Sequence, residues 1–79
     1  MFFYTYILRS IKNNKLYVGW TKDLRRRFAE HNDGKVNSTR YRGPFVLIYY
    51  EACLNEVKAK KREKYFKSGY GRKFLKMRI

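Results

Sequence analysis

Two tyrosine-bearing segments near the start of the chain constrain its fold most strongly. Residues 3–8 are aromatic and β-branched, as is typical of a β-strand, and residues 16–19 form a second such segment. An Asn-Asn pair at positions 13–14 favours a turn between them, so the sequence predicts a β-hairpin. Because side chains alternate across a strand, Tyr6 and Tyr17 share a face if the connecting loop has an even number of residues, and an odd loop would separate them.

A basic helix is predicted directly after the hairpin. Thr21 is a suitable N-cap, and Leu24 and Phe28 lie four positions apart, so both can face the core. Residues 32–34, Asn-Asp-Gly, are predicted to end the helix. A basic loop then covers residues 35–44.

The second half of the chain predicts one strand and two helices. Residues 45–50 are almost continuously apolar, which indicates a central strand buried on both faces. Asn55 can cap a helix that extends to about Lys67, residues 68–71 interrupt it, and residues 72–78 form a short last helix. The predicted fold class is α/β of the α+β kind, a small three-stranded sheet flanked by helices in the order ββαβαα.

The chain is short and strongly basic. Its 79 residues suffice for one domain, which we expect to span residues 1–79. Twenty lysines and arginines against six acidic residues give a net charge of +14. This charge predicts attraction to polyanions, nucleic acid first and an anionic membrane second. No run approaches the ~18 apolar residues of a membrane-spanning helix, so we expect no membrane partner.

The single cysteine also limits the possibilities. Cys53 cannot form an internal disulfide, so we expect no disulfide partner but a reduced, buried thiol in a cytoplasmic protein, associated with the nucleoid if the source is bacterial. One cysteine and one histidine do not supply the ligands of a structural zinc site.

The order of the motifs resembles the GIY-YIG nuclease superfamily, in particular its small single-domain members. Tyr4-Thr5-Tyr6 stands at the first motif and Tyr17-Val18-Gly19 at the second, and a basic helix follows. The resemblance covers nearly the whole chain. It implies a metal-dependent enzyme that hydrolyses phosphodiester bonds of DNA. No asparagine follows Glu63, and Trp20 stands where some members carry lysine, so the resemblance leaves the cleavage rate and the substrate undetermined.

The resemblance implies a catalytic role for five residues: Tyr6, Tyr17, Arg27, His31 and Glu63. In this family the first-motif tyrosine is the general base, the second tyrosine and the histidine assist, and the glutamate is the sole protein ligand of Mg²⁺ or Mn²⁺. A tyrosine can act as a base if a nearby metal or arginine lowers its pKa from ~10. An arginine fork matches phosphate geometry. We expect the five side chains to converge on one open, positively charged concavity.

Each of these residues also has a purely structural interpretation. The tyrosines could be core residues, Arg27 part of a solvated basic face, and His31 a partner of the helix dipole. Glu63 could form a surface pair with Lys67. Against that, apolar neighbours on the same stripe of the helix tilt Glu63 toward the packed side.

Further basic and aromatic residues are predicted to bind nucleic acid without reading its sequence. They are Trp20, Lys22, Arg25, Arg26, Lys35, Arg40, Arg42, Lys60, Lys64 and Lys67. A chain this short has no separate reading module, so we expect recognition of DNA structure or weakly specific cutting. Two alternatives stay open: a non-enzymatic nucleic-acid-binding protein on the same fold, and a small RNA-binding or ribosome-associated protein.

Overall fold

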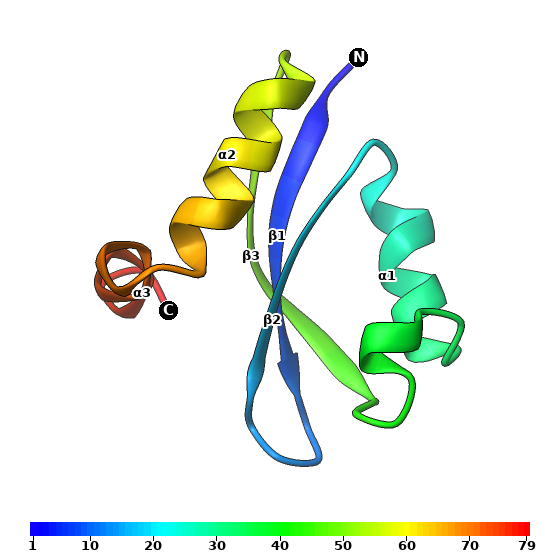
Figure 1. Ribbon diagram of the computed structural model, residues 1–79. Helices are drawn as coiled ribbons and strands as arrows, with labels where there is room; N and C mark the ends of the chain where they lie inside the picture. Colours follow the sequence, from blue (N-terminus) through cyan, green and yellow to red (C-terminus); the bar gives the residue numbers. More distant parts are fainter.

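The computed structural model describes all 79 residues and confirms the predicted α+β fold and its order of elements (Figure 1). Three strands and three α-helices follow one another as ββαβαα, with one 3₁₀ turn, η1, in the loop after the first helix. The elements are β1 (Phe3–Ser10), β2 (Leu16–Thr21), α1 (Leu24–Asn32), η1 (Asn37–Thr39), β3 (Phe45–Cys53), α2 (Glu56–Phe66) and α3 (Gly69–Lys76).

The hairpin has the register that places the two motif tyrosines on one face. Strands β1 and β2 are antiparallel, with Tyr6 opposite Gly19 and Leu8 opposite Tyr17. The pairing continues one step beyond β2, since the Ser10 amide donates to the Lys15 carbonyl at 2.9 Å, so an even number of residues, 11–14, lies between the last paired positions. Tyr6 and Tyr17 are therefore diagonal neighbours on the same face of the sheet.

The prediction that residues 45–50 form the central strand is wrong. The sheet order is β2-β1-β3, so β1 is central and β3 is an edge strand, longer than predicted because it extends to Cys53. Helices cover both faces of the sheet, α1 on one side and α2 with α3 on the other (Figure 1). Nor is β3 buried on both faces, since only Phe45 is buried and Val46 and Tyr50 are exposed. An apolar run therefore does not show by itself that a strand is central or covered on both sides.

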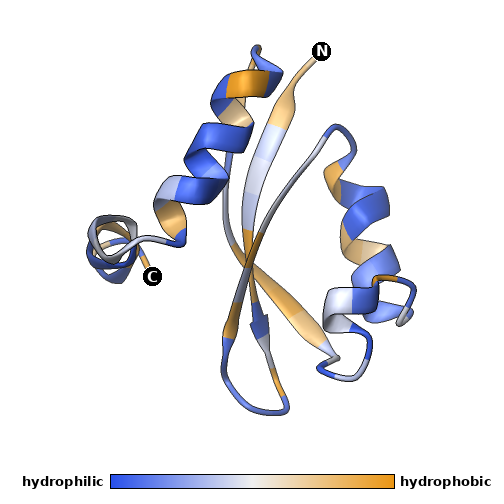
Figure 2. Ribbon diagram, in the orientation of Figure 1, coloured by the Kyte–Doolittle hydropathy of each residue, from blue (hydrophilic) through white to orange (hydrophobic).

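Each face of the sheet carries its own small hydrophobic cluster. Tyr6, Leu8 and Phe45 form one cluster, which Leu24 and Phe28 of α1 cover as predicted. The opposite cluster consists of Ile7, Val18, Phe66 and Leu75, which join the sheet to α2 and α3. Figure 2 shows that hydrophobic residues concentrate in the strands, whereas α2 is largely hydrophilic.

The start of α1 differs from the prediction, whereas its end agrees. Asp23, not Thr21, is the N-cap of α1, because its carboxylate accepts from the Arg26 amide at 3.2 Å. The Thr21 hydroxyl instead holds the cap, since it accepts from the Asp23 amide at 3.1 Å. At the other end, Gly34 has φ of 71°, which suits the predicted helix stop.

The break between the last two helices is shorter than predicted. Asn55 caps α2 as expected and α2 ends at Phe66, but α3 begins at Gly69, with Ser68 as its N-cap. The glycines after Ser68 lie inside the helix rather than interrupting it. Gly71 is there because a Cβ at this position would overlap the Tyr65 carbonyl, where α3 meets the end of α2.

Two further expectations can be compared with the structure. The Cys53 thiol is half-exposed rather than buried, because it lies at the end of an edge strand, where it donates to the Asn55 carbonyl at 3.3 Å. None of the helices has the length and apolar character needed to cross a membrane.

Candidate active site

The Tyr6 ring crosses strand β2 at a glycine. Tyr6 lies on the central strand opposite Gly19, and its side chain is 1% exposed. A Cβ at Gly19 would stand 2.5 Å from the Tyr6 hydroxyl oxygen and 2.6 Å from Cζ. Any side chain at this position would therefore displace the phenol ring. The glycine of the second motif is explained by this close approach and not by a special backbone conformation.

A buried hydrogen-bonded chain begins at the Tyr6 hydroxyl. The Tyr6 oxygen lies 2.8 Å from Nε2 of His31, and Nδ1 of His31 lies 2.7 Å from the Thr39 hydroxyl oxygen. His31 is 1% exposed and Thr39 is fully buried. The rings of Tyr17 and Phe45 enclose the imidazole, with centroids 4.8 Å and 6.0 Å from it. His31 is thus held by side-chain partners, not only by the helix terminus.

Burial keeps this chain uncharged. Burial, reinforced by the positive charge of Arg27, lowers the pKa of His31 to about 4, so the imidazole is neutral at physiological pH. Burial, and then the neighbouring Tyr17, raises the pKa of Tyr6 to about 12, although Arg27 acts in the opposite direction. Arg27 alone does not lower the pKa of Tyr6 below its ordinary value, because desolvation of the phenol outweighs the effect of one arginine.

Arg27 lies on α1 beside the hydroxyl of Tyr6. Its guanidinium donates to Glu30 at 3.2 Å. The pKa of Arg27 is raised, since burial would lower it but the interactions with Glu30 and Tyr6 outweigh burial. The same Glu30 pairs with Arg26 at 3.4 Å. Arg27 and Glu30 both line an open hollow of about 470 Å³ at the start of α1, in which Arg27 is half-exposed and accessible to a ligand.

Glu63 approaches from the other face of the sheet. It belongs to α2, and its side chain is 24% exposed, with Lys67 Nζ 3.5 Å from the carboxylate. It lines a second hollow, of about 320 Å³, together with three lysines. The negative charge of Glu63 still reaches Tyr6 and contributes weakly to its raised pKa. Trp20 of β2 lines both this hollow and that of Arg27.

The structure therefore brings four of the five expected catalytic residues together. Tyr6, Tyr17, His31 and Arg27 lie on the α1 side of the sheet. The five do not line one common concavity: Tyr6 and His31 are buried, while Arg27 and Glu63 border separate hollows that meet at Trp20. Glu63 also makes the ion pair with Lys67 that its spacing predicted.

The residues predicted to bind nucleic acid fall into two groups, apart from Arg25. Trp20, Lys22, Arg26, Lys60, Lys64 and Lys67 surround the outer edge of β2, and most of them are already engaged. Lys60 lies 5.0 Å above the Trp20 ring. Both Lys60 and Lys22 form ion pairs with Glu56. Lys35, Arg40 and Arg42 lie in the loop after α1, where Arg40 covers Tyr41. Arg25 is exposed on α1 and makes no ion pair.

Sequence reasoning missed the groups that hold the site in place. Thr39 ends the short 3₁₀ turn η1 in the loop after α1, where no periodicity marks it as a partner of His31. Arg62, next to Glu63, donates to both oxygens of Glu51 on β3 at 2.8 and 3.0 Å, and Tyr49 donates to the same carboxylate at 2.8 Å. The pKa of Glu51 is lowered, because these hydrogen bonds outweigh burial. This cluster fixes the orientation of α2, and only a three-dimensional structure reveals it.

Comparison with known proteins identifies the class to which this fold and site belong. The profile of the GIY-YIG catalytic domain matches residues 2–76. The chain therefore belongs to the GIY-YIG family, and the resemblance seen in the two tyrosine motifs is confirmed.

Within this family the chain is similar to small UPF0213 proteins. It is 45% identical over 65 residues to UPF0213 protein CPE1444 of Clostridium perfringens, which covers 81% of this chain and 69% of that protein. UPF0213 protein SpyM3_1077 of Streptococcus pyogenes is 43% identical over 65 residues, with 81% and 70% covered. The solution NMR structure of UPF0213 protein BH0048 from Bacillus halodurans superposes with a TM-score of 0.57 at 36% identity, covering 95% of this chain and 82% of that one.

Proposed function

We propose that the protein is a metal-dependent endonuclease that hydrolyses DNA phosphodiester bonds with selectivity for DNA structure or with weak specificity. The observation that carries this proposal is the hydrogen-bonded chain from Tyr6 through His31 to Thr39, with the Arg27 guanidinium beside it. A buried, fully satisfied chain of this kind at the edge of an exposed basic surface is more than packing alone requires.

The chain suggests how Tyr6 acts as a base although its pKa is raised. A neutral imidazole donates through one nitrogen and accepts through the other. If Nδ1–H donates to Thr39, Nε2 of His31 accepts from the Tyr6 hydroxyl. Tyr6 can then take a proton from the attacking water while passing its own proton to His31. No phenolate needs to form, so the raised pKa of Tyr6 is no obstacle to this role.

Arg27 links substrate binding to this proton transfer. Its charge is one cause of the lowered pKa of His31. A phosphate bound at Arg27 would offset that charge, so protonation of His31 becomes easier when the substrate is in place. The same guanidinium stabilises the charge that develops on the phosphoryl oxygens. The Tyr17 ring is tilted against the rings of Tyr6 and His31 and completes the wall of the site.

Glu63 is the group suited to hold the metal. It is a hard oxygen donor, partly exposed, and no cluster of three or more potential ligands exists elsewhere in the chain. Mg²⁺ accepts one or two protein carboxylates and completes its shell with water and substrate phosphate, so one glutamate is a sufficient protein contribution. When bound, Mg²⁺ or Mn²⁺ would supply Lewis-acid stabilisation of phosphoryl and leaving-group charge.

The basic surface predicts binding that depends on salt rather than on sequence. With a net charge of +14, contacts with about five phosphates would give a slope of log K against log salt of roughly −4 to −5. Fluorescence titrations of one duplex across a range of salt concentrations, and of several duplex sequences at one salt concentration, measure both properties. A flat salt response or a sharp preference for one sequence would contradict this account of binding.

A non-enzymatic nucleic-acid-binding protein is the second candidate, and one observation favours it. The Tyr6 hydroxyl is buried, so an attacking water reaches it only if the site opens or the substrate completes it. An RNA-binding protein of this fold would present exposed aromatic rings for single strands, of which Tyr41 and Tyr70 are examples. Neither candidate predicts a metal-dependent cleavage product.

A cleavage assay separates these possibilities. Branched, nicked and linear DNA and a single-stranded RNA are incubated with Mg²⁺, Mn²⁺ or EDTA, and products are resolved on denaturing gels. Arg27→Ala is compared with Arg26→Ala, because both arginines pair with Glu30 and only Arg27 lies beside Tyr6. We expect both variants to weaken DNA binding by one charge, and Arg27→Ala alone to lose cleavage at saturating DNA. No product from any substrate with either metal would favour the binding protein.

A further inference from the structure

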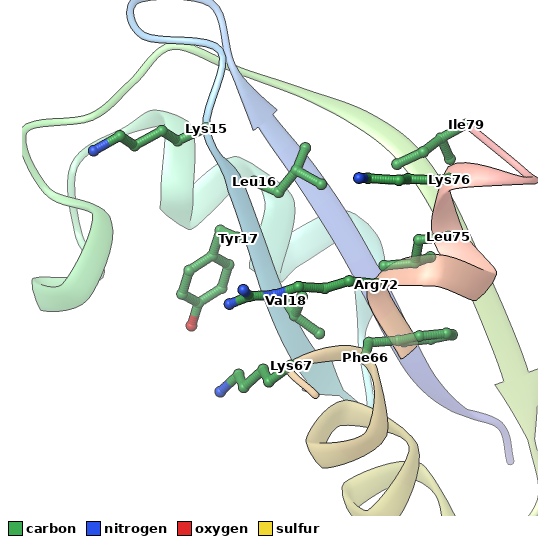
Figure 3. Close-up of a pocket in the computed structure, with 10 residues that line it drawn as sticks. All are labelled: Lys15, Leu16, Tyr17, Val18, Phe66, Lys67, Arg72, Leu75, Lys76 and Ile79. Carbon is green, nitrogen blue, oxygen red and sulfur yellow. The ribbon is translucent and has the colours of Figure 1, made fainter. Parts of the chain in front are cut away.

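A third hollow lies between β2 and α3, beside the candidate active site (Figure 3). Its volume is about 480 Å³, within the range of small-ligand pockets. The floor is apolar and comes from both elements and the end of α2: Leu16, Val18, Phe66 and Leu75 line it. None of the proposed catalytic steps uses this β2–α3 hollow.

Cations surround the apolar floor. Lys15, Lys67, Arg72 and Lys76 line the hollow, and no acidic residue does. Figure 3 shows the side chains of Arg72 and Lys76 extending from α3 toward β2. Only Lys67 forms an ion pair, with Glu63, so the other three charges are free to meet an anion. An apolar floor with a cationic rim is complementary to a ligand that is flat and apolar in one part and anionic in another.

Tyr17 connects this hollow to the candidate active site. Its side chain lines the hollow, and its ring centroid lies 4.8 Å from that of His31 and 6.3 Å from that of Tyr6. A ligand that fills the hollow against Tyr17 is therefore one aromatic ring away from the proposed proton relay. The occupant of the hollow and the phosphate at the active site can belong to one polynucleotide strand.

We propose that the β2–α3 hollow holds one unpaired nucleobase of the substrate strand, adjacent to the bond that is cut, with the flanking phosphates on the cationic rim. A base that is not stacked in a duplex exposes two apolar faces, and apolar surroundings favour their burial. A fully paired duplex exposes only phosphates and base edges, which are polar and gain nothing from contact with an apolar floor.

The consequence is a physical basis for selecting DNA structure. Substrates with an extrahelical or single-stranded nucleotide next to the cleavage point would fill the hollow, and continuous duplex would leave it empty. This inference rests on the proposed function in one respect, that the strand bound at Tyr17 is the one to be hydrolysed. An acidic peptide with an apolar side chain is the other occupant that the same chemistry would admit, and the experiment distinguishes the two.

The test measures binding without cleavage. A labelled duplex with one extrahelical thymidine is compared with the same duplex carrying an abasic tetrahydrofuran unit at that position, by fluorescence anisotropy in EDTA. We expect wild-type protein to bind the base-containing duplex roughly five- to tenfold more tightly, at the lower end of what stacking of one base contributes. Because no metal is present, the result does not depend on whether the protein cuts DNA.

Two matched pairs of variants locate the effect. Leu16 and Val46 lie opposite Arg9 on the two edge strands and are 42% and 45% exposed, but only Leu16 lines the hollow. We expect Leu16→Gln to remove the preference for the base-containing duplex and Val46→Gln to keep it. Lys76 and Lys73 both lie on α3, and only Lys76 lines the rim. Lys76→Gln should weaken binding of the bulged duplex severalfold more than Lys73→Gln.

Ile79→Gln serves as a second floor variant, because this residue also lines the hollow and lies at the chain end. It keeps the test decisive if Leu16→Gln does not fold, as judged by circular dichroism. Equal affinity of the wild-type protein for the two duplexes would overturn the proposal, and so would equal loss of the preference in Leu16→Gln and Val46→Gln. Saturable binding of an acidic, leucine-containing peptide that Leu16→Gln abolishes, without any base preference, would overturn it in favour of a peptide partner.

Discussion

The two faces of the sheet differ in burial and in charge. On the α1 face, Tyr6, His31 and Thr39 are buried, uncharged and fully hydrogen-bonded. On the α2 face, Glu63 is partly exposed among lysines, and its helix is anchored by the pair of Arg62 with Glu51. One face therefore holds a neutral, buried hydrogen-bonded chain, which we propose is a proton path, whereas the other holds charge accessible to solvent and ions.

The difference teaches that strand β2 is the part of the site where the two faces meet. Gly19 allows the Tyr6 ring to cross this strand, and Trp20 borders the hollows of both Arg27 and Glu63. A polynucleotide along the outer edge of β2 could touch both faces at once. The Tyr6–His31–Thr39 chain and the Glu63 carboxylate can then act on one phosphate only if the bound substrate contacts both faces. The following predictions test this division from the largest expected effect to the smallest.

Loss of the Glu63 carboxylate should have the largest effect. We expect Glu63→Gln to lower metal-dependent cleavage by roughly a hundredfold or more, since it removes the charge that holds the cation. DNA binding measured in EDTA should be unchanged or tighter, because a negative charge near phosphate has been removed. The measurements are single-turnover cleavage with Mg²⁺ and Mn²⁺, and anisotropy titrations.

Glu56→Gln is the matched control for that change. Glu56 lies two turns earlier on α2 and also pairs with lysines, Lys22 and Lys60, so its substitution removes an equal charge. It should leave single-turnover cleavage near the wild-type rate. If Glu63→Gln cuts as fast as Glu56→Gln, the carboxylate of Glu63 is not the metal ligand, and the assignment of metal binding to the α2 face is wrong.

Removal of the Tyr6 hydroxyl tests the neutral path on the α1 face. Tyr6→Phe keeps the ring that packs over Gly19 but breaks the hydrogen bond to His31. We expect about a hundredfold loss of cleavage rate, as for loss of a group that transfers a proton, with binding preserved. Tyr49→Phe is the control, because its hydroxyl also donates to a partner, Glu51, away from the site. Equal cleavage by both variants would exclude a proton path through Tyr6.

The crossing of β2 by the Tyr6 ring can be tested through stability. Gly19→Ala places a methyl group 2.5 Å from the hydroxyl oxygen and 2.6 Å from Cζ of Tyr6, and overpacking of this kind costs about 1–3 kcal/mol. In a domain of this size each kcal/mol lowers the melting temperature by roughly 4–8 °C. Gly69→Ala is the control, since nothing lies within 4 Å of the added atom. A wild-type melting temperature for Gly19→Ala would show that the ring moves aside at no cost.

The fold could be predicted from the sequence because local signals agree with one another. The hairpin, the Asn55 cap and the glycine after α1 each have a short-range physical cause. The position of β3 could not be predicted, since a run of apolar residues has the same composition in a central strand as at the edge, where Val46 and Tyr50 are exposed. The start of α3 was missed because Gly71 is needed for close packing on Tyr65, which a local pattern does not distinguish from a helix break.

The candidate site was predictable only as far as the motif extends. Its order identified Tyr6, Tyr17, Arg27, His31 and Glu63 as a set, but not the division of the set between two faces. The raised pKa of Tyr6 follows from burial, a property of the assembled fold. Thr39 and the pair of Arg62 with Glu51 depend on contacts between distant segments, for which the sequence carries no periodic signal.

The smallest effect concerns the pH dependence of stability. Burial lowers the pKa of His31 from 6.5 to about 4, so the unfolded chain binds a proton at a higher pH than the folded protein does. The stabilisation is therefore complete above pH 6.5 and decreases as the pH falls toward 4. For these values the free energy of unfolding decreases by about 2 kcal/mol between pH 8 and pH 5.

Urea titrations across this range measure the effect, with His31→Gln as the comparison. The variant is less stable throughout, because Tyr6 and Thr39 lose their shared partner, but its stability should change little between pH 8 and pH 5. The carboxylates with lowered pKa values, Glu30 and Glu51, affect stability only at lower pH, so the window isolates the histidine. Parallel pH profiles for the wild type and His31→Gln would mean that His31 is not held neutral by burial, and the contrast between a neutral face and a charged face would fail.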